Sequence, residues 1–338
     1  MSGAADGPAI AVVGAGAFGT ALAVLVASDA TPVWLWARRA EAAAAIAATR
    51  ENGVHLPGVR LPGAVRVTCD LEALADAGLW LLAVPAQHMR AVLAQAPVGG
   101  RPALVITAKG LEAETLMPMG EVAAAVAPGC AVAILSGPSF AADIARGKPT
   151  AVTLAAADLG LAAALAARLA RPFFRPYASD DPLGAQVGGF TKNVLAIACG
   201  VVVGAELGES ARAALVTRGF AEMTRLGLAM GARAETLAGL SGLGDLVLTA
   251  GSLRSRNMAL GVALARGQTA DAALAGRTDV AEGAATAPAL RRLAGRLEVD
   301  MPICEAVAAL LAGELALADA IAGLLARPLR AETDLRGA

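Results

Sequence analysis

Residues 9–19 read AIAVVGAGAFG, and this stretch decides the fold of the first part of the chain. An apolar run leads directly into the G-x-G-x-x-G pattern formed by Gly14, Gly16 and Gly19. In this pattern the first glycine allows a tight turn, the second lets a pyrophosphate approach the backbone, and the third lets the next helix pack against the strand. The helix N-terminus then offers free N–H groups and a positive dipole end to the anion.

The surroundings of the glycine pattern make it more specific. Residues 18–28 are predicted to form a helix and residues 32–36 a second strand, so the glycines lie in a complete strand–helix–strand unit. A glycine-rich turn without a ligand stays open as the alternative, but it does not account for the whole unit. We therefore predict a dinucleotide-binding site at this turn.

The end of the second strand bears on which dinucleotide binds. An acidic residue there usually bonds the ribose 2′-hydroxyl of NAD(H), whereas this chain has Arg38 and Arg39. Guanidinium groups suit the 2′-phosphate of NADP(H) and offer no acceptor to a free hydroxyl. We predict that NADP(H) is preferred and that NAD(H) can also bind. The alternative is that one or both arginines only face solvent, and it is stronger for Arg39.

The composition argues against several classes of function. The chain carries 28 Lys and Arg against 29 Asp and Glu, and only 3% of its residues are aromatic, so nucleic acid is not an expected partner. Residues 7–28 are uncharged, but glycines interrupt them and no basic region precedes them. We therefore expect no signal peptide, no stable membrane insertion and a cytoplasmic location. Four scattered cysteines and two histidines indicate no metal site.

The secondary-structure pattern divides the chain into two domains. A short strand is expected at residues 65–68, and uninterrupted apolar strands at residues 79–84, 103–107, 131–135 and 151–154. Such strands are typical of a mostly parallel sheet that is covered on both faces. After about residue 180 the strand signals fade and helical segments follow one another. We predict an α/β Rossmann-like N-terminal domain over residues 1–180 and an all-α, substrate-specific C-terminal domain over residues 181–338.

Two lysines are candidates for proton chemistry. The chain has only three lysines, and Lys192 lies within an otherwise apolar predicted helix. An ammonium group there must be paired, or its pKa must fall, and either state suits proton exchange with a substrate hydroxyl. Lys109 follows a predicted strand, where ligands of parallel sheets bind. The alternatives are a lysine whose stem alone is buried at position 192 and a surface lysine at position 109.

Two further polar positions could contact a substrate. Asp245 follows a glycine-rich stretch and could orient Lys192 or accept from a substrate hydroxyl. Residues 255–257 read Ser-Arg-Asn, a set that suits a phosphate monoester because arginine can bind it with two hydrogen bonds. The alternatives are an ordinary turn or cap aspartate and a helix N-cap followed by solvated polar residues.

Taken together, these segments resemble the NAD(P)-dependent sn-glycerol-3-phosphate dehydrogenase family, and closely its bacterial form. The resemblance covers roughly residues 9–327, and the motifs follow the family's order and spacing. The matching segments are GAGAFGTALA (14–23), VWLWARR (33–39), HLPGVRLP (55–62), TAKGLE (107–112), LSGPSFA (135–141), GGFTKNVLAI (188–197), TRGFAEM (217–223), GLGDLVLT (242–249), SRN (255–257), VAEG (280–283) and MPI (301–303).

The resemblance implies an oxidoreductase that reduces dihydroxyacetone phosphate reversibly to sn-glycerol 3-phosphate with NAD(P)H, for phospholipid synthesis. The implied partners are a small phosphorylated substrate and, in a homodimer, a second copy of the chain. Two alternatives stay open: a reductase of a different hydroxy acid, and a dinucleotide-sensing regulator without turnover.

The resemblance and the glycine and arginine patterns together predict the site residues. The catalytic set is Lys192 as the proton acceptor, with Lys109 and Asp245. The cofactor-binding set is Gly14, Gly16, Ala17, Phe18, Gly19, Arg38, Arg39, Lys109, Ala141, Arg256, Val280 and Glu282. The substrate-binding set is Lys109, Gly137, Ser139, Lys192, Asp245, Ser255, Arg256 and Asn257.

Overall fold

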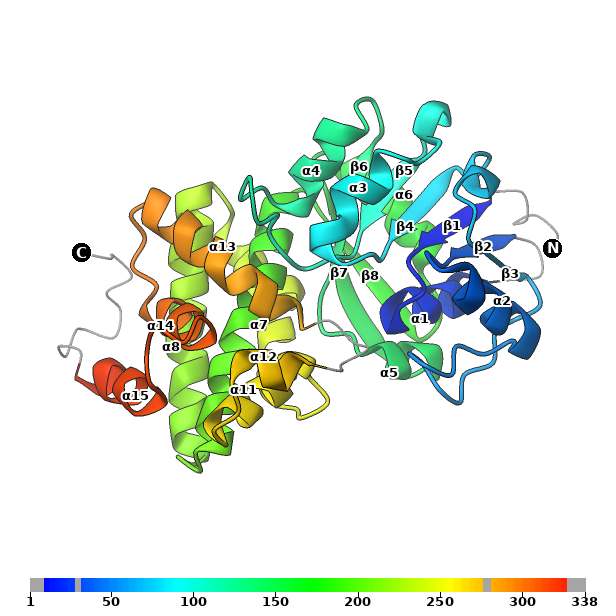
Figure 1. Ribbon diagram of the computed structural model, residues 1–338. Coiled ribbons are helices and arrows are strands. Elements are labelled where there is room, and N and C mark those ends of the chain that lie inside the picture. Colours follow the sequence, from blue (N-terminus) through cyan, green and yellow to red (C-terminus); the bar gives the residue numbers. More distant parts are fainter. Residues whose placement is uncertain (1–8, 28–31, 276–280, 327–338) are drawn as a thin grey trace. The chain divides into compact units, whose positions relative to one another are not determined.

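The computed structural model describes residues 9–27, 32–275 and 281–326 (Figure 1). Residue contacts divide the chain into two compact units. The first unit comprises the residues up to Ala108 together with Met119–Pro182. The second comprises the short segment Lys109–Pro118 and the residues from Leu183 onward.

An eight-stranded sheet organises the first unit, in the order β3-β2-β1-β4-β5-β6-β7-β8. Neighbouring strands are parallel except β6 and β7, which are antiparallel. This confirms the predicted Rossmann-like, mostly parallel sheet. The strands are β1 (Ile10–Val13), β2 (Val33–Trp36), β3 (Val65–Thr68), β4 (Leu79–Leu82), β5 (Ala103–Ile106), β6 (Val132–Ser136), β7 (Thr150–Ala156) and β8 (Phe174–Ser179).

Helices connect these strands and cover the sheet. Successive residues of a strand face opposite sides, and all four residues of β1 and of β4 are buried, so both faces of the sheet are covered. One face forms an apolar core with residues of α1, α5 and α6. The helices of this unit are α1 (Ala17–Val26), α2 (Ala40–Thr49), α3 (Met89–Leu93), α4 (Met119–Val126), α5 (Ala141–Ala145) and α6 (Leu159–Leu169).

From Leu183 onward the second unit is built of helices over its described residues, as the sequence predicted. Its helices are α7 (Pro182–Gly204), α8 (Glu209–Met230), α9 (Ala234–Ala238), α10 (Asp245–Ala250), α11 (Arg256–Ala265), α12 (Ala270–Leu274), α13 (Glu282–Arg296), α14 (Pro302–Leu311) and α15 (Leu317–Leu325). A π-helical turn, Leu240–Gly244, leads into α10. By length and composition α7 could cross a membrane, but 89% of its most apolar 18-residue stretch is buried inside the protein. Its apolar residues therefore serve as core.

Candidate active site

The glycine-rich turn follows β1, where the order of the strands reverses. Gly14 has a φ of +115°, and a Cβ at this position would lie 2.8 Å from the carbonyl carbon of Ala83. A Cβ at Gly19 would lie 1.9 Å from the Gly14 carbonyl oxygen. Only glycine fits at these two positions, so β1, the turn and α1 can pack closely.

The outer side of the same turn is open. A Cβ at Gly16 would meet no atom within 4 Å, and Gly16 is the N-cap of α1. No described side chain caps this helix, so its first N–H groups are available to an anion. Ala17 and Phe18 lie in that first turn. The turn therefore fits a dinucleotide pyrophosphate, which binds at the switch point of such sheets.

The other predicted residues of the first unit also follow strand ends. Arg38 and Arg39 follow β2 and are exposed. Gly137 follows β6 with a φ of +144°, and its carbonyl oxygen accepts from Ser139 Oγ at 2.9 Å. Ala141 begins α5. Because β2, β1 and β6 run in the same direction, all these residues lie at one edge of the sheet.

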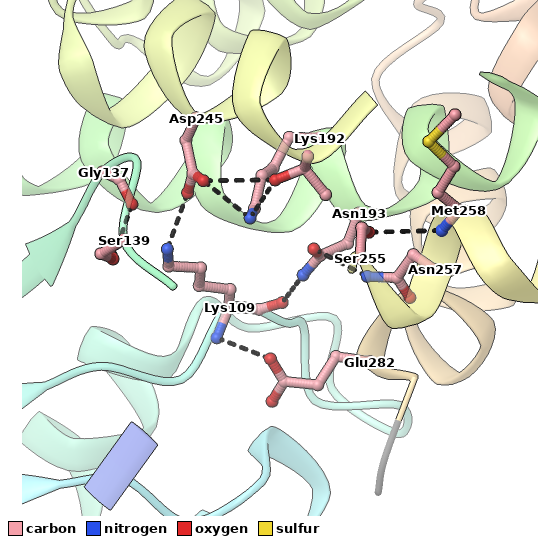
Figure 2. Close-up of polar contacts among 11 residues, drawn as sticks. Lys109, Gly137, Ser139, Lys192, Asn193, Asp245, Ser255, Asn257, Met258 and Glu282 are labelled. Carbon is pink, nitrogen blue, oxygen red and sulfur yellow. Dashed lines mark hydrogen bonds and ion pairs between the residues drawn. The ribbon is translucent and has the colours of Figure 1, made fainter. Parts of the chain in front are cut away.

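Two lysines and one carboxylate meet in the second unit (Figure 2). Lys192 on α7 donates from Nζ to Asp245 Oδ1 at 2.9 Å and to Thr249 Oγ1 at 2.8 Å. Lys109 Nζ donates to Asp245 Oδ2 at 2.7 Å. Lys192 is 7% exposed and Asp245 1% exposed. Lys192 is therefore not a lysine whose stem alone is buried, because its Nζ is itself buried and paired.

The charges in this cluster shift one another's protonation. Burial lowers the pKa of Lys192 to about 8, against the raising effect of Asp245. Burial alone would raise the pKa of Asp245, but the two ammonium groups outweigh it and hold that pKa below its usual value. Asp245 is therefore ionised at neutral pH, and Lys192 can gain or lose a proton close to neutral pH.

The backbone of Lys109 is fixed on both sides of its Cα atom. Its N–H donates to Glu282 Oε2 at 3.3 Å, and its carbonyl oxygen accepts from Asn193 Nδ2 at 3.1 Å. Asn193 Oδ1 in turn accepts from Asn257 Nδ2 at 2.9 Å, and Asn257 Oδ1 accepts from the Gly283 N–H at 3.0 Å. This chain of hydrogen bonds links α7, α11 and α13 to the lysine.

The segment that follows Lys109 is anchored in the helical core. Leu111 is fully buried and Leu116 is 9% exposed, and both belong to the core of the second unit. Leu116 has a φ of 63°, a left-handed conformation that is rare for leucine and needs support from its surroundings. The two leucines therefore fix Lys109 to the second unit, although the lysine follows β5 in the sequence.

The Ser-Arg-Asn set lies at the start of α11. Ser255 is the N-cap of this helix, and its Oγ accepts from the Met258 N–H at 3.3 Å, as the alternative interpretation expected. Arg256 is exposed, and its guanidinium has no ion-pair partner among the described residues. Its charge is therefore available to an anion at the helix N-terminus. Val280, a predicted cofactor contact, lies outside the described residues.

Two residues of the cluster were not predicted from the sequence. Thr249 lies one helical turn after Asp245, a spacing that places both on one face of α10 and could have identified it. Asn193 directly follows Lys192, but adjacent helical residues point in different directions. Its contact with the Lys109 carbonyl required the tertiary structure.

The fold and these clusters define a dinucleotide-dependent oxidoreductase, with a cofactor turn on a parallel sheet and a buried lysine able to exchange a proton. Comparisons with known proteins agree with this class. The family model described as NAD-dependent glycerol-3-phosphate dehydrogenase N-terminus matches residues 9–162, and the corresponding C-terminus model matches residues 181–322. The chain therefore belongs to the NAD-dependent glycerol-3-phosphate dehydrogenase family, as its motifs predicted.

Individual relatives are similar over nearly the whole chain. The NAD(P)+ glycerol-3-phosphate dehydrogenase of Sphingopyxis alaskensis is 55% identical over 321 residues, which cover 95% of this chain and 97% of the relative. That of Caulobacter vibrioides is 55% identical over 326 residues, covering 96% and 98%. The crystal structure of glycerol-3-phosphate dehydrogenase from Coxiella burnetii matches with a TM-score of 0.90 at 35% identity, covering 95% of this chain and 99% of that one.

Proposed function

We propose that this protein reduces dihydroxyacetone phosphate reversibly to sn-glycerol 3-phosphate with NAD(P)H, and thereby supplies glycerol phosphate for phospholipid synthesis. The observation that carries the proposal is the buried Lys192, held by Asp245 and Thr249, in a chain of this family. We assign dinucleotide binding to the N-terminal domain, residues 1–180, and substrate specificity to the helical domain, residues 181–338.

Reduction of the substrate carbonyl requires a hydride and a proton. When bound, the nicotinamide cofactor supplies the hydride to C2. Lys192 Nζ donates the proton to the oxygen on C2, and it accepts the proton back in the reverse reaction. A pKa of about 8 keeps most of the lysine as ammonium at neutral pH while leaving the proton easy to transfer.

Asp245, Thr249 and Lys109 support this transfer. Asp245 and Thr249 hold Nζ of Lys192 by hydrogen bonds of 2.9 and 2.8 Å, which fix the direction of the proton. Asp245 also holds the ammonium group of Lys109. We propose that Lys109 places positive charge near the same substrate oxygen, where it stabilises the developing alkoxide.

The start of α11 is the proposed phosphate site. The exposed guanidinium of Arg256 can bind a phosphate with two hydrogen bonds, next to backbone N–H groups of the first helical turn. Ser255 and Asn257 complete this set, and Gly137 and Ser139 are the proposed substrate contacts of the sheet domain. Holding the phosphate fixes the position of C2 for reaction.

The glycine turn is the proposed cofactor site. Gly14 and Gly19 shape the turn, and Gly16 with the first N–H groups of α1 would hold the pyrophosphate. Arg38 is the proposed partner of a 2′-phosphate, which would favour NADP(H) over NAD(H). Further cofactor contacts are proposed from the family resemblance at Ala17, Phe18, Arg39, Lys109, Ala141, Arg256, Val280 and Glu282.

The proposal is tested by following the oxidation of NADPH and of NADH by the wild-type protein. Dihydroxyacetone phosphate, unphosphorylated dihydroxyacetone and a panel of 2-keto acids serve as substrates. We expect turnover with dihydroxyacetone phosphate and little with dihydroxyacetone. Turnover with only a 2-keto acid would identify a different hydroxy-acid reductase. Binding of cofactor without any turnover would identify a dinucleotide-sensing regulator.

We also propose a cytoplasmic location, which the sequence predicts, and a homodimeric state for the enzyme. Light scattering of the purified protein measures the molecular mass in solution and tests the second proposal. Fractionation of cells, followed by activity measurement, tests the first.

A further inference from the structure

A buried amide side chain contacts the glycine turn from outside its motif. Asn52 follows α2 and is 2% exposed. Its Nδ2 donates to the carbonyl oxygen of Ala15 and to Thr20 Oγ1, both at 2.8 Å. Its Oδ1 accepts from the His55 N–H at 3.3 Å. Both amide hydrogens of Asn52 therefore go to the turn and to the helix that follows it.

The hydrogen bond to Ala15 sets the direction of a neighbouring N–H group. A peptide group is planar and trans, so its carbonyl oxygen and its N–H point in opposite directions. Because Asn52 holds the Ala15 carbonyl on the buried side, the N–H of Gly16 points to the other side. That side is open, since a Cβ at Gly16 would meet no atom within 4 Å.

The loop that carries Asn52 is itself well fixed. The guanidinium of Arg50 donates to the carbonyl oxygen of Val65 at 2.9 Å and also to that of Pro62. Glu51 Oε1 accepts from the Gly58 N–H at 2.7 Å. Three apolar side chains of this loop lie in the core of the first unit, and they are Leu56, Val59 and Leu61. The loop can therefore hold Asn52 in place against the turn.

We infer that Asn52 is a positioning residue for the cofactor: it sets the glycine turn in the conformation that binds a dinucleotide pyrophosphate. The inference rests on the proposed cofactor site. A turn that already has its N–H groups aligned binds an anion without an ordering cost. Without Asn52 the turn occupies other conformations as well. The apparent affinity for the dinucleotide then falls in proportion to the fraction of molecules whose turn is in the binding conformation.

The test is the dissociation constant for NADPH, measured by titration calorimetry without substrate. Asn52→Leu removes both donors at similar size, and Asn52→Asp presents acceptors to the Ala15 carbonyl. We expect each variant to bind NADPH about tenfold more weakly, because each loses the donor to the Ala15 carbonyl oxygen that sets the turn. The KM for dihydroxyacetone phosphate at saturating NADPH should change by less than about twofold, because the substrate contacts are intact.

A pair of variants at Thr20 tests the same contact from the other side. Thr20 is fully buried, so both variants change only an internal contact. Thr20→Val removes the acceptor for one amide hydrogen of Asn52, and we expect about threefold weaker binding of NADPH. Thr20→Ser keeps the hydroxyl, and the affinity should stay at the wild-type value.

Leu165→Ala is the control for a general loss of stability. Leu165 is buried on α6, which packs on β7 and β8. We expect it to lower the melting temperature at least as much as Asn52→Leu and to bind NADPH as the wild type does. Wild-type affinity in both Asn52 variants overturns the inference, and so does an equal loss in Leu165→Ala.

If neither Asn52 variant folds, the Thr20 pair decides, and equal affinities of Thr20→Val and Thr20→Ser overturn the inference. Failure of the proposed cofactor site gives a different result. In that case the wild-type protein itself binds neither NADPH nor NADH, and the inference about Asn52 is lost with it.

Discussion

Replacing Asp245 by asparagine removes the charge on which the lysine cluster depends. The carboxylate contacts Nζ of Lys192 at 2.9 Å and Nζ of Lys109 at 2.7 Å. Asparagine has a similar size and keeps one oxygen that can accept from one of the two ammonium groups. Its amide N–H group then faces the other ammonium, and the carboxylate that lies between the two lysines no longer balances their repulsion.

The size of the effect follows from the protonation of Lys192. With a pKa of about 8, about nine-tenths of this lysine is ammonium at pH 7. A single opposite charge at this distance moves a pKa by about 1–3 units. Its loss therefore lowers the pKa of Lys192 and leaves between about one-half and about one-hundredth of Lys192 protonated at pH 7. Reduction of dihydroxyacetone phosphate consumes this proton, so its rate at pH 7 should fall roughly 2- to 100-fold.

The assay is kcat/KM for dihydroxyacetone phosphate reduction as a function of pH, with NADPH saturating. In the wild type, kcat/KM should fall as the pH rises through about 8. In Asp245→Asn this decline should occur about 1–3 pH units lower. Asp271→Asn, which removes an exposed charge on α12, is the control and should behave as the wild type. An Asp245→Asn variant with wild-type kcat/KM and an unchanged decline would refute the reasoning.

Three further substitutions test other parts of the protein. Arg256→Ala should lower kcat/KM for dihydroxyacetone phosphate about 10- to 100-fold by removing a charge-assisted contact, and an unchanged value places the phosphate elsewhere. Arg38→Ala should raise KM for NADPH but not for NADH. The preference of the wild type for NADPH should shrink as the salt concentration rises. Equal kcat/KM for the two cofactors in the wild type contradicts the role of Arg38. Burial raises the pKa of Glu222 to about 7, although its carboxylate accepts from the N–H groups of Ile303 and Cys304. The folded state therefore retains a proton that the unfolded chain releases. As the pH rises from about 5 to about 7, the melting temperature of the wild type should fall relative to that of Glu222→Gln, and parallel pH profiles of the two proteins contradict this prediction.

Most of the fold could be predicted from local sequence patterns. Central strands buried on both faces read as uninterrupted apolar runs, and β4 (Leu79–Leu82) lies within the predicted residues 79–84. Strand β8 was missed because it pairs only with β7 at the edge of the sheet, contains Pro176 and has a mostly accessible surface. The sequence does not delimit helix α10 within the helical part of the chain, because a glycine-rich π-helical turn precedes it and no capping side chain marks its start.

The candidate site could be predicted as a set of residue types, but not as a set of contacts. Motifs identify Lys109, Lys192 and Asp245, yet Lys109 follows a strand of the sheet and gives no local sign of belonging to the helical unit. Its backbone is held by Asn193, 84 positions away, and by Glu282, 173 positions away. Hydrogen bonds over such separations depend on tertiary packing, which periodicity along the chain does not report.

The proton transfer assigned to Lys192 is tested most directly by kcat for dihydroxyacetone phosphate reduction in Lys192→Ala, measured together with the dissociation constant for NADPH. We predict that kcat falls about a hundredfold or more, while the affinity for NADPH stays within about twofold of the wild-type value. Lys148→Ala, which removes an exposed lysine paired with Asp143, is the control and should keep wild-type kcat. A Lys192→Ala variant with near wild-type kcat would contradict the assignment of Lys192 as the proton donor and acceptor.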